Sequence, residues 1–205
     1  ELILHHPDIR QFTTVWMDSL RGGESMLVNT NKLIRFYDGA TGLKTGSTGS
    51  AGYCLSATAE KNGMELIAVV LKGKTSDERF SDAKSLLNYG FSTWSLVTVT
   101  PDEVLPPVPV TLGVRGTVQP VLTSENTLLV EKTLANGLTK EVALAESVAA
   151  PVYAGDTLGQ LTVRDAAGNT VAELPILAGE DVGHVTFVQM LGRCLARGFC
   201  MGPQS

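Results

Sequence analysis

Apolar positions in the first half of the chain predict two neighbouring strands joined by a tight turn. Residues 51–58 and 64–71 are both strand-like runs, and Asn62 and Gly63 between them strongly favour a two-residue hairpin loop. Residues 66–71 are apolar at every position, so this strand has no polar face. We therefore expect it to be covered on both sides.

A helix is predicted to follow the second strand. Ser76 is a good N-cap residue, and Asp77 and Glu78 place negative charge in the first turn, where it suits the helix dipole. Apolar residues then recur at a period of about 3.6 residues, so we expect this face to pack on the sheet. They are Phe80, Ala83, Leu87, Gly90, Phe91 and Trp94.

The composition changes after Trp94 and marks a domain boundary. Prolines cluster there, at positions 101, 106, 107 and 109. Short strand-like runs separated by turn signals then recur along the chain. They cover residues 108–114, 127–132, 140–145, 157–164 and 170–177. This spacing predicts an all-β domain, a small sandwich, over residues 95–181.

The last predicted element is an amphipathic helix over residues 184–199, within a terminal segment that covers residues 182–205. Arg193 and Arg197 lie one turn apart on its polar face. The apolar face consists of Val185, Val188, Leu191, Leu195 and Phe199. A helix docked on its own domain shows the same period, so the pattern alone leaves a docked helix and a membrane-surface helix open.

Composition and charge exclude some functions. The chain has 205 residues, enough for one large or two small domains, and its net charge of -5 argues against nucleic-acid binding, which needs a basic surface. No run approaches the ~20 apolar residues that span a bilayer. The three cysteines fit no zinc or redox spacing. Cys54 lies in an alternating apolar run and is predicted to be a small buried side chain.

The tripeptide Lys44-Thr45-Gly46 carries the candidate chemistry, because a strand hairpin and a helix follow it, as expected for an active-site edge strand. Lys44 can attract a substrate carboxylate and favour deprotonation of a neighbouring hydroxyl. Thr45 offers a hydroxyl to the same carboxylate, and Gly46 lets an extended peptide lie close to the strand. The backbone N–H of Ser47 can point at a developing oxyanion.

The surroundings of this tripeptide resemble one family. Residues 38–53 read DGATGLKTGSTGSAGY, which is similar to the third active-site motif of the low-molecular-mass penicillin-binding proteins, the D-alanyl-D-alanine carboxypeptidases. Residues 5–9 (HHPDI) and 71–75 (LKGKT) support the resemblance. It implies an α+β chain. Residues 1–94 would be the C-terminal portion of a β-lactamase/transpeptidase-like α/β catalytic domain, followed by the all-β sandwich domain and a C-terminal amphipathic helix that acts as a membrane anchor.

The resemblance also implies the site residues. Lys44 matches the catalytic lysine of the motif, and Lys44, Thr45, Gly46 and Ser47 are expected to bind substrate. In the family an arginine after the last strand reaches the cleft and helps to hold the terminal carboxylate of the substrate, and Arg79 matches that position. The residues alone also allow Arg79 to be an exposed charge in the first turn of the helix.

The order of motifs departs from the family pattern, which is S-x-x-K, then S-x-N, then K-T-G. Nothing before Lys44 matches the first two. Residues 81–84 spell S-x-x-K and residues 124–126 spell S-x-N, but both follow Lys44. We treat them as coincidental, because a motif counts only in its structural context. We therefore expect the serine nucleophile and the S-x-N residues to lie outside this chain.

The implied reaction is serine acyl transfer on a peptidoglycan stem peptide that ends in D-Ala-D-Ala. A serine attacks the amide between the two D-alanines, D-alanine leaves, and water hydrolyses the acyl-enzyme. β-Lactams are expected to be inhibitors, and no cofactor or metal is implied. The adjacent His5 and His6 do not indicate a metal site, because adjacent residues point to different sides of a helix or strand and no carboxylate-histidine cluster joins them. The implied location is extracytoplasmic, on the outer face of the bacterial cytoplasmic membrane, with residues 184–199 on the membrane surface.

Two alternatives stay open at this point. The chain lacks a nucleophile motif, so it is also compatible with a non-catalytic binding or scaffold module of the cell envelope. A class A β-lactamase also has K-T-G near its end. It should stop soon after the final helix of its catalytic domain, whereas this chain continues for over a hundred residues after Trp94.

Overall fold

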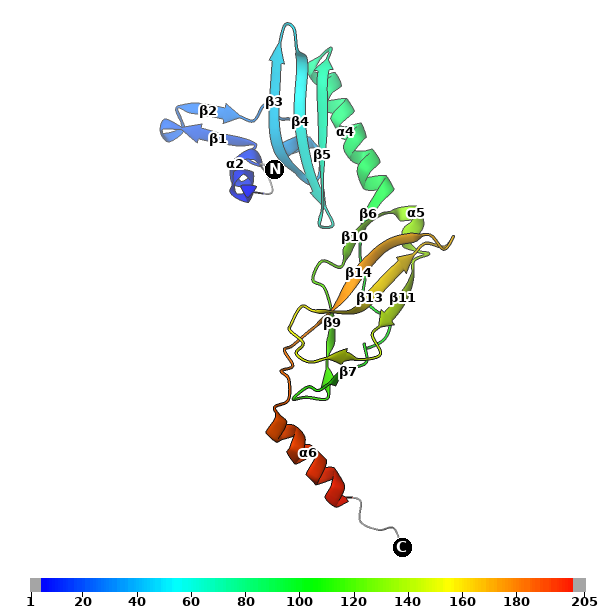
Figure 1. Ribbon diagram of the computed structural model, residues 1–205. Coiled ribbons are helices and arrows are strands. Elements are labelled where there is room, and N and C mark those ends of the chain that lie inside the picture. The colour runs from blue at the N-terminus through cyan, green and yellow to red at the C-terminus, as the bar shows by residue number, and fades with distance from the viewer. Residues whose placement is uncertain (1–4, 201–205) are drawn as a thin grey trace. The chain divides into compact units, whose positions relative to one another are not determined.

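The computed structural model describes residues 5–200, with side chains placed up to Arg193 and at Leu195 (Figure 1). The chain divides into two compact units, the first made of Glu1–Leu96 with Leu129–Ala135 and the second of Val97–Leu128 with Asn136–Ser205. Helices and strands both contribute to the described residues, and the predicted α+β class is confirmed.

The centre of the first unit is an antiparallel sheet of three strands in the order β3-β4-β5. They are β3 (Ala40–Thr48), β4 (Gly52–Lys61) and β5 (Met64–Gly73). Asn62 and Gly63 join β4 to β5 and have φ angles of 52° and 76°. Two successive positive φ angles match the right-handed twist of a hairpin, and these two residue types adopt them readily. The predicted hairpin is confirmed.

Helix α4 (Ser76–Thr93) covers one face of this sheet (Figure 1). Its predicted apolar face packs on the strands, and Phe80, Ala83 and Leu87 are each at most 5% exposed. The predicted N-cap is wrong by one residue. Thr75 has extended backbone angles, and its side chain accepts a hydrogen bond from the Glu78 N–H, so Thr75 caps the helix and Ser76 already belongs to it.

The opposite face of β5 is open, which contradicts the predicted cover on both sides. Ile67, Val69 and Leu71 are 60%, 56% and 73% exposed. Successive strand residues point to opposite faces, and α4 packs only on the face that carries Ala68 and Val70. Within residues 5–193 no element covers these three side chains.

The predicted burial of Cys54 is also wrong, because its side chain is only half-buried. Its Sγ donates to the carbonyl oxygen of Ala51 over 3.4 Å. The next residue of β4, Leu55, takes the core position and is 1% exposed. Strand alternation therefore places Cys54 on the side of β4 that faces away from the core.

Several short elements precede the sheet and were not predicted. They are η1 (Pro7–Ile9), α2 (Arg10–Thr13), β1 (Met17–Leu20), η2 (Arg21–Gly23), β2 (Ser25–Val28) and α3 (Leu33–Phe36). Strands β1 and β2 pair as an antiparallel hairpin. Arg10 links α2 to the sheet, because its guanidinium forms ion pairs with Glu60 at 2.7 Å and Glu65 at 2.5 Å.

The second unit is rich in strands. Its four-stranded sheet has the order β11-β13-β14-β9, and a three-stranded sheet has the order β12-β7-β8. The strands are β7 (Val108–Thr111), β8 (Thr117–Val118), β9 (Pro120–Leu122), β11 (Thr139–Leu144), β12 (Val148–Ala149), β13 (Thr157–Arg164) and β14 (Thr170–Ala178). Buried residues of both sheets, among them Val108, Val118 and Leu158, share one core.

Strands β6 (Trp94–Thr98) and β10 (Thr127–Glu131) pair with each other, and α5 (Lys132–Ala135) follows β10. The predicted runs at 108–114, 127–132, 140–145, 157–164 and 170–177 all contain a strand. Sequence reasoning missed β6, β8, β9 and β12. Strands β8, β9 and β12 have only two or three residues, which are too few to show an alternating pattern.

Helix α6 (Phe187–Cys200) is the last element, and it begins later than the predicted residue 184. Val185 is only 5% exposed, and its N–H donates to the carbonyl oxygen of Leu112 over 2.8 Å. Val185 therefore belongs to the core of the β-rich unit and not to the apolar face of the helix. The side chains of Arg197 and Phe199, which the prediction also used, lie outside the described residues.

Arg193 of α6 is held by the β-rich unit. Its guanidinium donates to the carbonyl oxygens of Gly113 at 3.0 Å and Val114 at 2.6 Å. The side chains of Phe187 and Val188 remain 81% and 77% exposed. Among the helices in the described part of the chain, none is both long and apolar enough to cross a membrane.

Candidate functional site

The K-T-G tripeptide lies on β3, an edge strand of the three-stranded sheet in the described structure. Lys44 pairs with Ser56, Thr45 with Leu55, and Gly46 with Cys54 of β4. The β3–β4 turn is closed at Gly52, which has a φ of 63°; a Cβ there would lie 2.9 Å from the carbonyl oxygen of Gly73. Glycine is therefore required for this turn to approach the end of β5.

Lys44 and Thr45 point to opposite faces of β3, as successive strand residues do. The Lys44 side chain is exposed, and its Nζ donates to the carbonyl oxygen of Thr45 over 2.5 Å. Thr45 is only 8% exposed. Its hydroxyl lies 2.6 Å from the hydroxyl of Thr30, which is itself exposed. The tripeptide thus presents an ammonium group on one side and a hydroxyl pair on the other.

The next two residues of the motif are open to approach. A Cβ built on Gly46 would meet no atom within 4 Å, and the Ser47 side chain is exposed. Gly46 adds no side chain of its own to this space. An extended peptide could therefore lie directly against the backbone of β3.

Arg79 lies in the first turn of α4, and its side chain contacts the backbone of the tripeptide. It is 7% exposed, and its Nη1 donates to the carbonyl oxygens of Gly46 at 3.3 Å and Cys54 at 3.2 Å. The interpretation of Arg79 as an exposed helix charge is therefore wrong. Its guanidinium carbon also lies 5.4 Å from the centroid of the Tyr53 ring and 4.8 Å from that of Phe80.

The charge of Arg79 has no carboxylate partner among the described side chains. None of the ion pairs there includes Arg79, and its buried Nε has no hydrogen-bond partner. Burying a guanidinium costs several kcal/mol unless hydrogen bonds or an opposite charge offset it. Backbone carbonyls supply part of that compensation, and an anion beside the strand would supply more.

Sequence reasoning missed one part of the site, the loop of Asn29, Thr30 and Asn31. Asn31 is 1% exposed, and its side-chain amide donates to the carbonyl oxygen of Gly42, two residues before Lys44, over 2.8 Å. Asn and Asp side chains commonly close such turns. The N-x-N spelling before a short helix could have indicated a turn, but not that it contacts β3.

The S-x-x-K spelling at residues 81–84 lies on α4, as expected. Ser81 is exposed, and its carbonyl oxygen accepts a hydrogen bond from the Ser85 hydroxyl. None of the hydrogen bonds of the described side chains joins Ser81 to Lys44 or Lys84. The S-x-N spelling at residues 124–126 belongs to the second unit. The structure thus brings neither spelling to Lys44.

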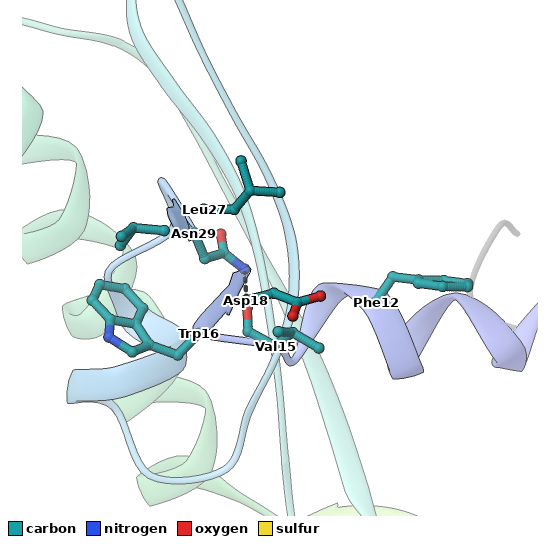
Figure 2. A pocket seen from close by; sticks show the side chains of 7 residues that line it. Phe12, Val15, Trp16, Asp18, Leu27 and Asn29 are labelled. Atoms are coloured by element: carbon teal, nitrogen blue, oxygen red, sulfur yellow. Dashed lines mark hydrogen bonds between the residues drawn. The ribbon is translucent and has the colours of Figure 1, made fainter. Parts of the chain in front are cut away.

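A separate shallow pocket of about 270 Å³ lies beside the β1–β2 hairpin (Figure 2). Its lining consists of Phe12, Val15, Trp16, Asp18, Leu27, Val28 and Asn29. Figure 2 shows the Asn29 side chain donating to the carbonyl oxygen of Val15, at 3.0 Å. Asp18 is the only acidic group of this lining, and none of the predicted site residues contributes to it. The K-T-G strand is therefore the better candidate for the chemistry.

Comparison with known proteins gives two adjoining family matches. Residues 2–75 match the family described as D-alanyl-D-alanine carboxypeptidase. Residues 97–184 match the C-terminal domain of penicillin-binding protein 5. The first match contains the K-T-G strand, and the second contains most of the β-rich unit. Together they define the class of protein: a segment of the D-alanyl-D-alanine carboxypeptidase family followed by a C-terminal domain of the penicillin-binding protein 5 type.

Individual relatives agree with this class. The D-alanyl-D-alanine carboxypeptidase DacF of Bacillus subtilis (strain 168) is 33% identical over 94% of this chain and 51% of its own length. DacC of Escherichia coli (strain K12), also a D-alanyl-D-alanine carboxypeptidase, is 30% identical over 69% of this chain and 36% of its own length. The chain thus spans about half, or less, of the length of these relatives.

Solved structures share the fold. Penicillin-binding protein 5 from Haemophilus influenzae superposes with a TM-score of 0.71 at 23% identity, over 89% of this chain and 54% of that one. PBP3 from Streptococcus pneumoniae, described as a peptidoglycan synthesis regulatory factor, superposes with a TM-score of 0.61 at 24% identity, over 88% of this chain and 54% of that one. The chain belongs to the D-alanyl-D-alanine carboxypeptidase family of penicillin-binding proteins.

Proposed function

We propose that this chain supplies the K-T-G part of a serine-type D-alanyl-D-alanine carboxypeptidase. In this proposal residues 1–94 contribute to the catalytic domain, residues 95–181 form most of the β-rich domain, and α6 (Phe187–Cys200) contacts the membrane surface. One observation carries the proposal: Lys44 and Thr45 lie on an edge strand, and the buried guanidinium of Arg79 contacts that strand at Gly46. The Lys44 ammonium, the Thr45 hydroxyl and the Arg79 guanidinium are thus all attached to, or in contact with, residues 44–46 of β3.

The substrate of the proposal is a peptidoglycan stem peptide that ends in D-Ala-D-Ala. Thr45 and Arg79 hold the terminal carboxylate, and the Ser47 N–H donates to the oxyanion that develops at the carbonyl under attack. Lys44 favours deprotonation of the neighbouring hydroxyl groups through its charge. A serine attacks the amide, D-alanine leaves, and water releases the shortened peptide.

β-Lactams would enter the same site and acylate the serine. Their carboxylate takes the place of the terminal carboxylate of the peptide, so Thr45 and Arg79 hold it in the same way. The nucleophile itself would come from residues outside this sequence, because nothing before Lys44 spells S-x-x-K. No step of the proposal uses a metal or a cofactor.

The place of action in the proposal is the outer face of the bacterial cytoplasmic membrane. The exposed apolar side chains of α6 support it: Leu191 and Leu195 are 50% and 55% exposed, in addition to Phe187 and Val188. A helix with such a stripe lies in the membrane interface rather than across it. The contacts of Arg193 with Gly113 and Val114 would keep the β-rich unit close to that surface.

The test is an assay of the full-length gene product with a peptide that ends in D-Ala-D-Ala and with a labelled penicillin. The proposal predicts release of D-alanine and a stable labelled band. A labelled band that disappears within seconds, with no D-alanine release, would indicate a β-lactamase. Neither release nor labelling would favour a non-catalytic envelope module.

A further inference from the structure

The loop of Asn29, Thr30 and Asn31 is fixed to the structure by its two asparagines. The Asn29 amide donates to the carbonyl oxygens of Thr13 and Val15, and its side-chain oxygen accepts from the Asn31 N–H over 2.9 Å. Every polar atom of the Asn29 side chain is therefore used within the fold. Asparagine side chains that bridge their own backbone two residues on are common in such turns.

Asn31 fixes the other end of the loop. Its amide donates to the Gly42 carbonyl oxygen at 2.8 Å, and its side-chain oxygen accepts from the Leu33 N–H at 3.2 Å. Because Asn31 is 1% exposed, these bonds are sheltered from water and hold the loop firmly against β3. Thr30 lies between the two asparagines, and its hydroxyl contacts none of the loop atoms but reaches Thr45.

The hydroxyls of Thr30 and Thr45 lie 2.6 Å apart, so one donates its proton to the other. If Thr45 donates to Thr30, its proton is occupied and it cannot donate to an anion. If Thr30 donates, the Thr45 proton is free. A carboxylate accepts only, so its presence beside Thr45 selects the second arrangement, in which the two hydroxyls form a chain and the first bond strengthens the second.

We propose that Thr30 is a positioning residue for carboxylate recognition, because its hydroxyl donates to Thr45 Oγ1 and leaves the Thr45 proton to the ligand. This inference rests on the proposed function, in which Thr45 binds the terminal carboxylate. Thr30 acts through Thr45 and need not touch the substrate. A purely structural role would instead affect every ligand of the site equally.

The experiment titrates the 205-residue chain with N-acetyl-D-alanine and follows the backbone amides of Thr45, Gly46 and Ser47 by NMR. N-acetyl-D-alaninamide, which lacks the carboxylate, is the control ligand. Thr30→Val removes the hydroxyl at nearly constant shape, and Thr30→Ser restores it. Thr14→Val is the matched control, because the Thr14 hydroxyl bonds only the Arg10 carbonyl oxygen of its own helix.

Loss of one neutral hydrogen bond in the chain is expected to raise the dissociation constant for N-acetyl-D-alanine about three- to tenfold in Thr30→Val. Thr30→Ser and Thr14→Val should bind as the unchanged chain does, and weak binding of the carboxamide should not change. In a Thr45→Val background Thr30→Val should have no further effect. If Thr30→Val shifted amides throughout β4 and β5, Thr30→Ala would replace it.

Two results would overturn the inference while leaving the proposed function intact. One is unchanged affinity of Thr30→Val for N-acetyl-D-alanine, and the other is an equal loss for the acid and the carboxamide. A different result would count against the proposed function itself: no shift at Thr45, Gly46 or Ser47 in the unchanged chain, because the strand would then hold no carboxylate.

Discussion

The guanidinium of Arg79 donates to the carbonyl oxygen of Gly46 over 3.3 Å, so the first turn of α4 is joined directly to the K-T-G strand. The same Nη1 reaches the Cys54 carbonyl oxygen of the neighbouring strand. One arginine therefore joins β3, β4 and α4, and it also holds the unbalanced charge of the site. The guanidinium that makes these contacts is also the group that we propose binds the carboxylate.

Arg79→Ala should reduce both stability and ligand binding. Hydrogen bonds from a charged, 93%-buried donor are worth about 1.5–3 kcal/mol, so the free energy of unfolding of this chain should fall by an amount of that order. Thermal and urea unfolding followed by circular dichroism measure it. Arg21→Ala, at an exposed position of η2, is the control and should change little. An unchanged unfolding curve for Arg79→Ala would show that the observed contacts do not stabilise the unit.

The 205-residue chain should form no covalent adduct with a β-lactam. Ser81 is exposed on α4 and has no contact with Lys44, so no serine of an S-x-x-K spelling is activated by the K-T-G strand. Intact-mass analysis after incubation with a penicillin measures this. A stable adduct that maps to Ser81 would contradict our interpretation of residues 81–84 as a coincidence.

Asp165 should make the β-rich unit sensitive to acid. Hydrogen bonds from the Asn169 side chain, and then from backbone N–H groups of the β13–β14 turn, lower the pKa of its carboxyl. Because the pKa is lowered in the folded state, the ionised carboxylate stabilises the fold above the unfolded pKa of about 3.9. This stabilisation is lost as the pH falls through the folded pKa.

Asp165→Ala should therefore destabilise the chain at pH 7, and the difference from the unchanged chain should shrink as the pH falls below the unfolded pKa of about 3.9. Urea unfolding at a series of pH values measures it. Asp82→Ala, at an exposed position on α4, is the matched control and should show no such trend. A destabilisation by Asp165→Ala that is constant from pH 7 to pH 2 would exclude the carboxylate as its cause.

Removal of α6 should release the chain from membranes. The truncation should follow Thr186, so that Val185, which is part of the core of the β-rich unit, is kept. Full burial of Phe187, Val188, Leu191 and Leu195 would each contribute about 1.5–3 kcal/mol, so even partial insertion gives measurable binding. Sedimentation with anionic vesicles compares the chain, the truncated form and a Leu191→Glu variant.

The chain should sediment with the vesicles, and the other two forms should remain largely in solution. High salt should weaken binding only in part, because the apolar contribution is not screened. If all three forms stay in the supernatant, the membrane proposal is wrong, and α6 is a structural element that Arg193 docks on the β-rich unit.

Sequence patterns predicted the elements that have a local signal. Asn62 and Gly63 specify their turn by themselves, and the period of α4 follows from the face that it buries. The β1–β2 hairpin had no such signal, because nearly all of its residues are exposed and no alternation marks a buried face. The same limit applies to β5, whose apolar residues did not reveal that α4 would cover only one side.

The candidate site shows a similar division. Lys44, Thr45 and Gly46 were predicted because they adjoin one another in a motif. The contacts of Arg79 with Gly46 and of Thr30 with Thr45 join residues that are far apart along the chain, and a spacing of 33 or 15 positions carries no periodic signal. Only the fold brings them together.

The rate of acylation by a labelled penicillin in the full-length gene product, with and without Lys44→Ala, tests the central proposal most directly. Lys44 is exposed, so its loss should leave the fold intact, while the loss of its charge should slow acylation about 10²- to 10³-fold. Lys72→Ala, at an exposed position of β5, should acylate normally. Near-normal acylation of Lys44→Ala would contradict the assignment of the K-T-G strand as the active-site strand.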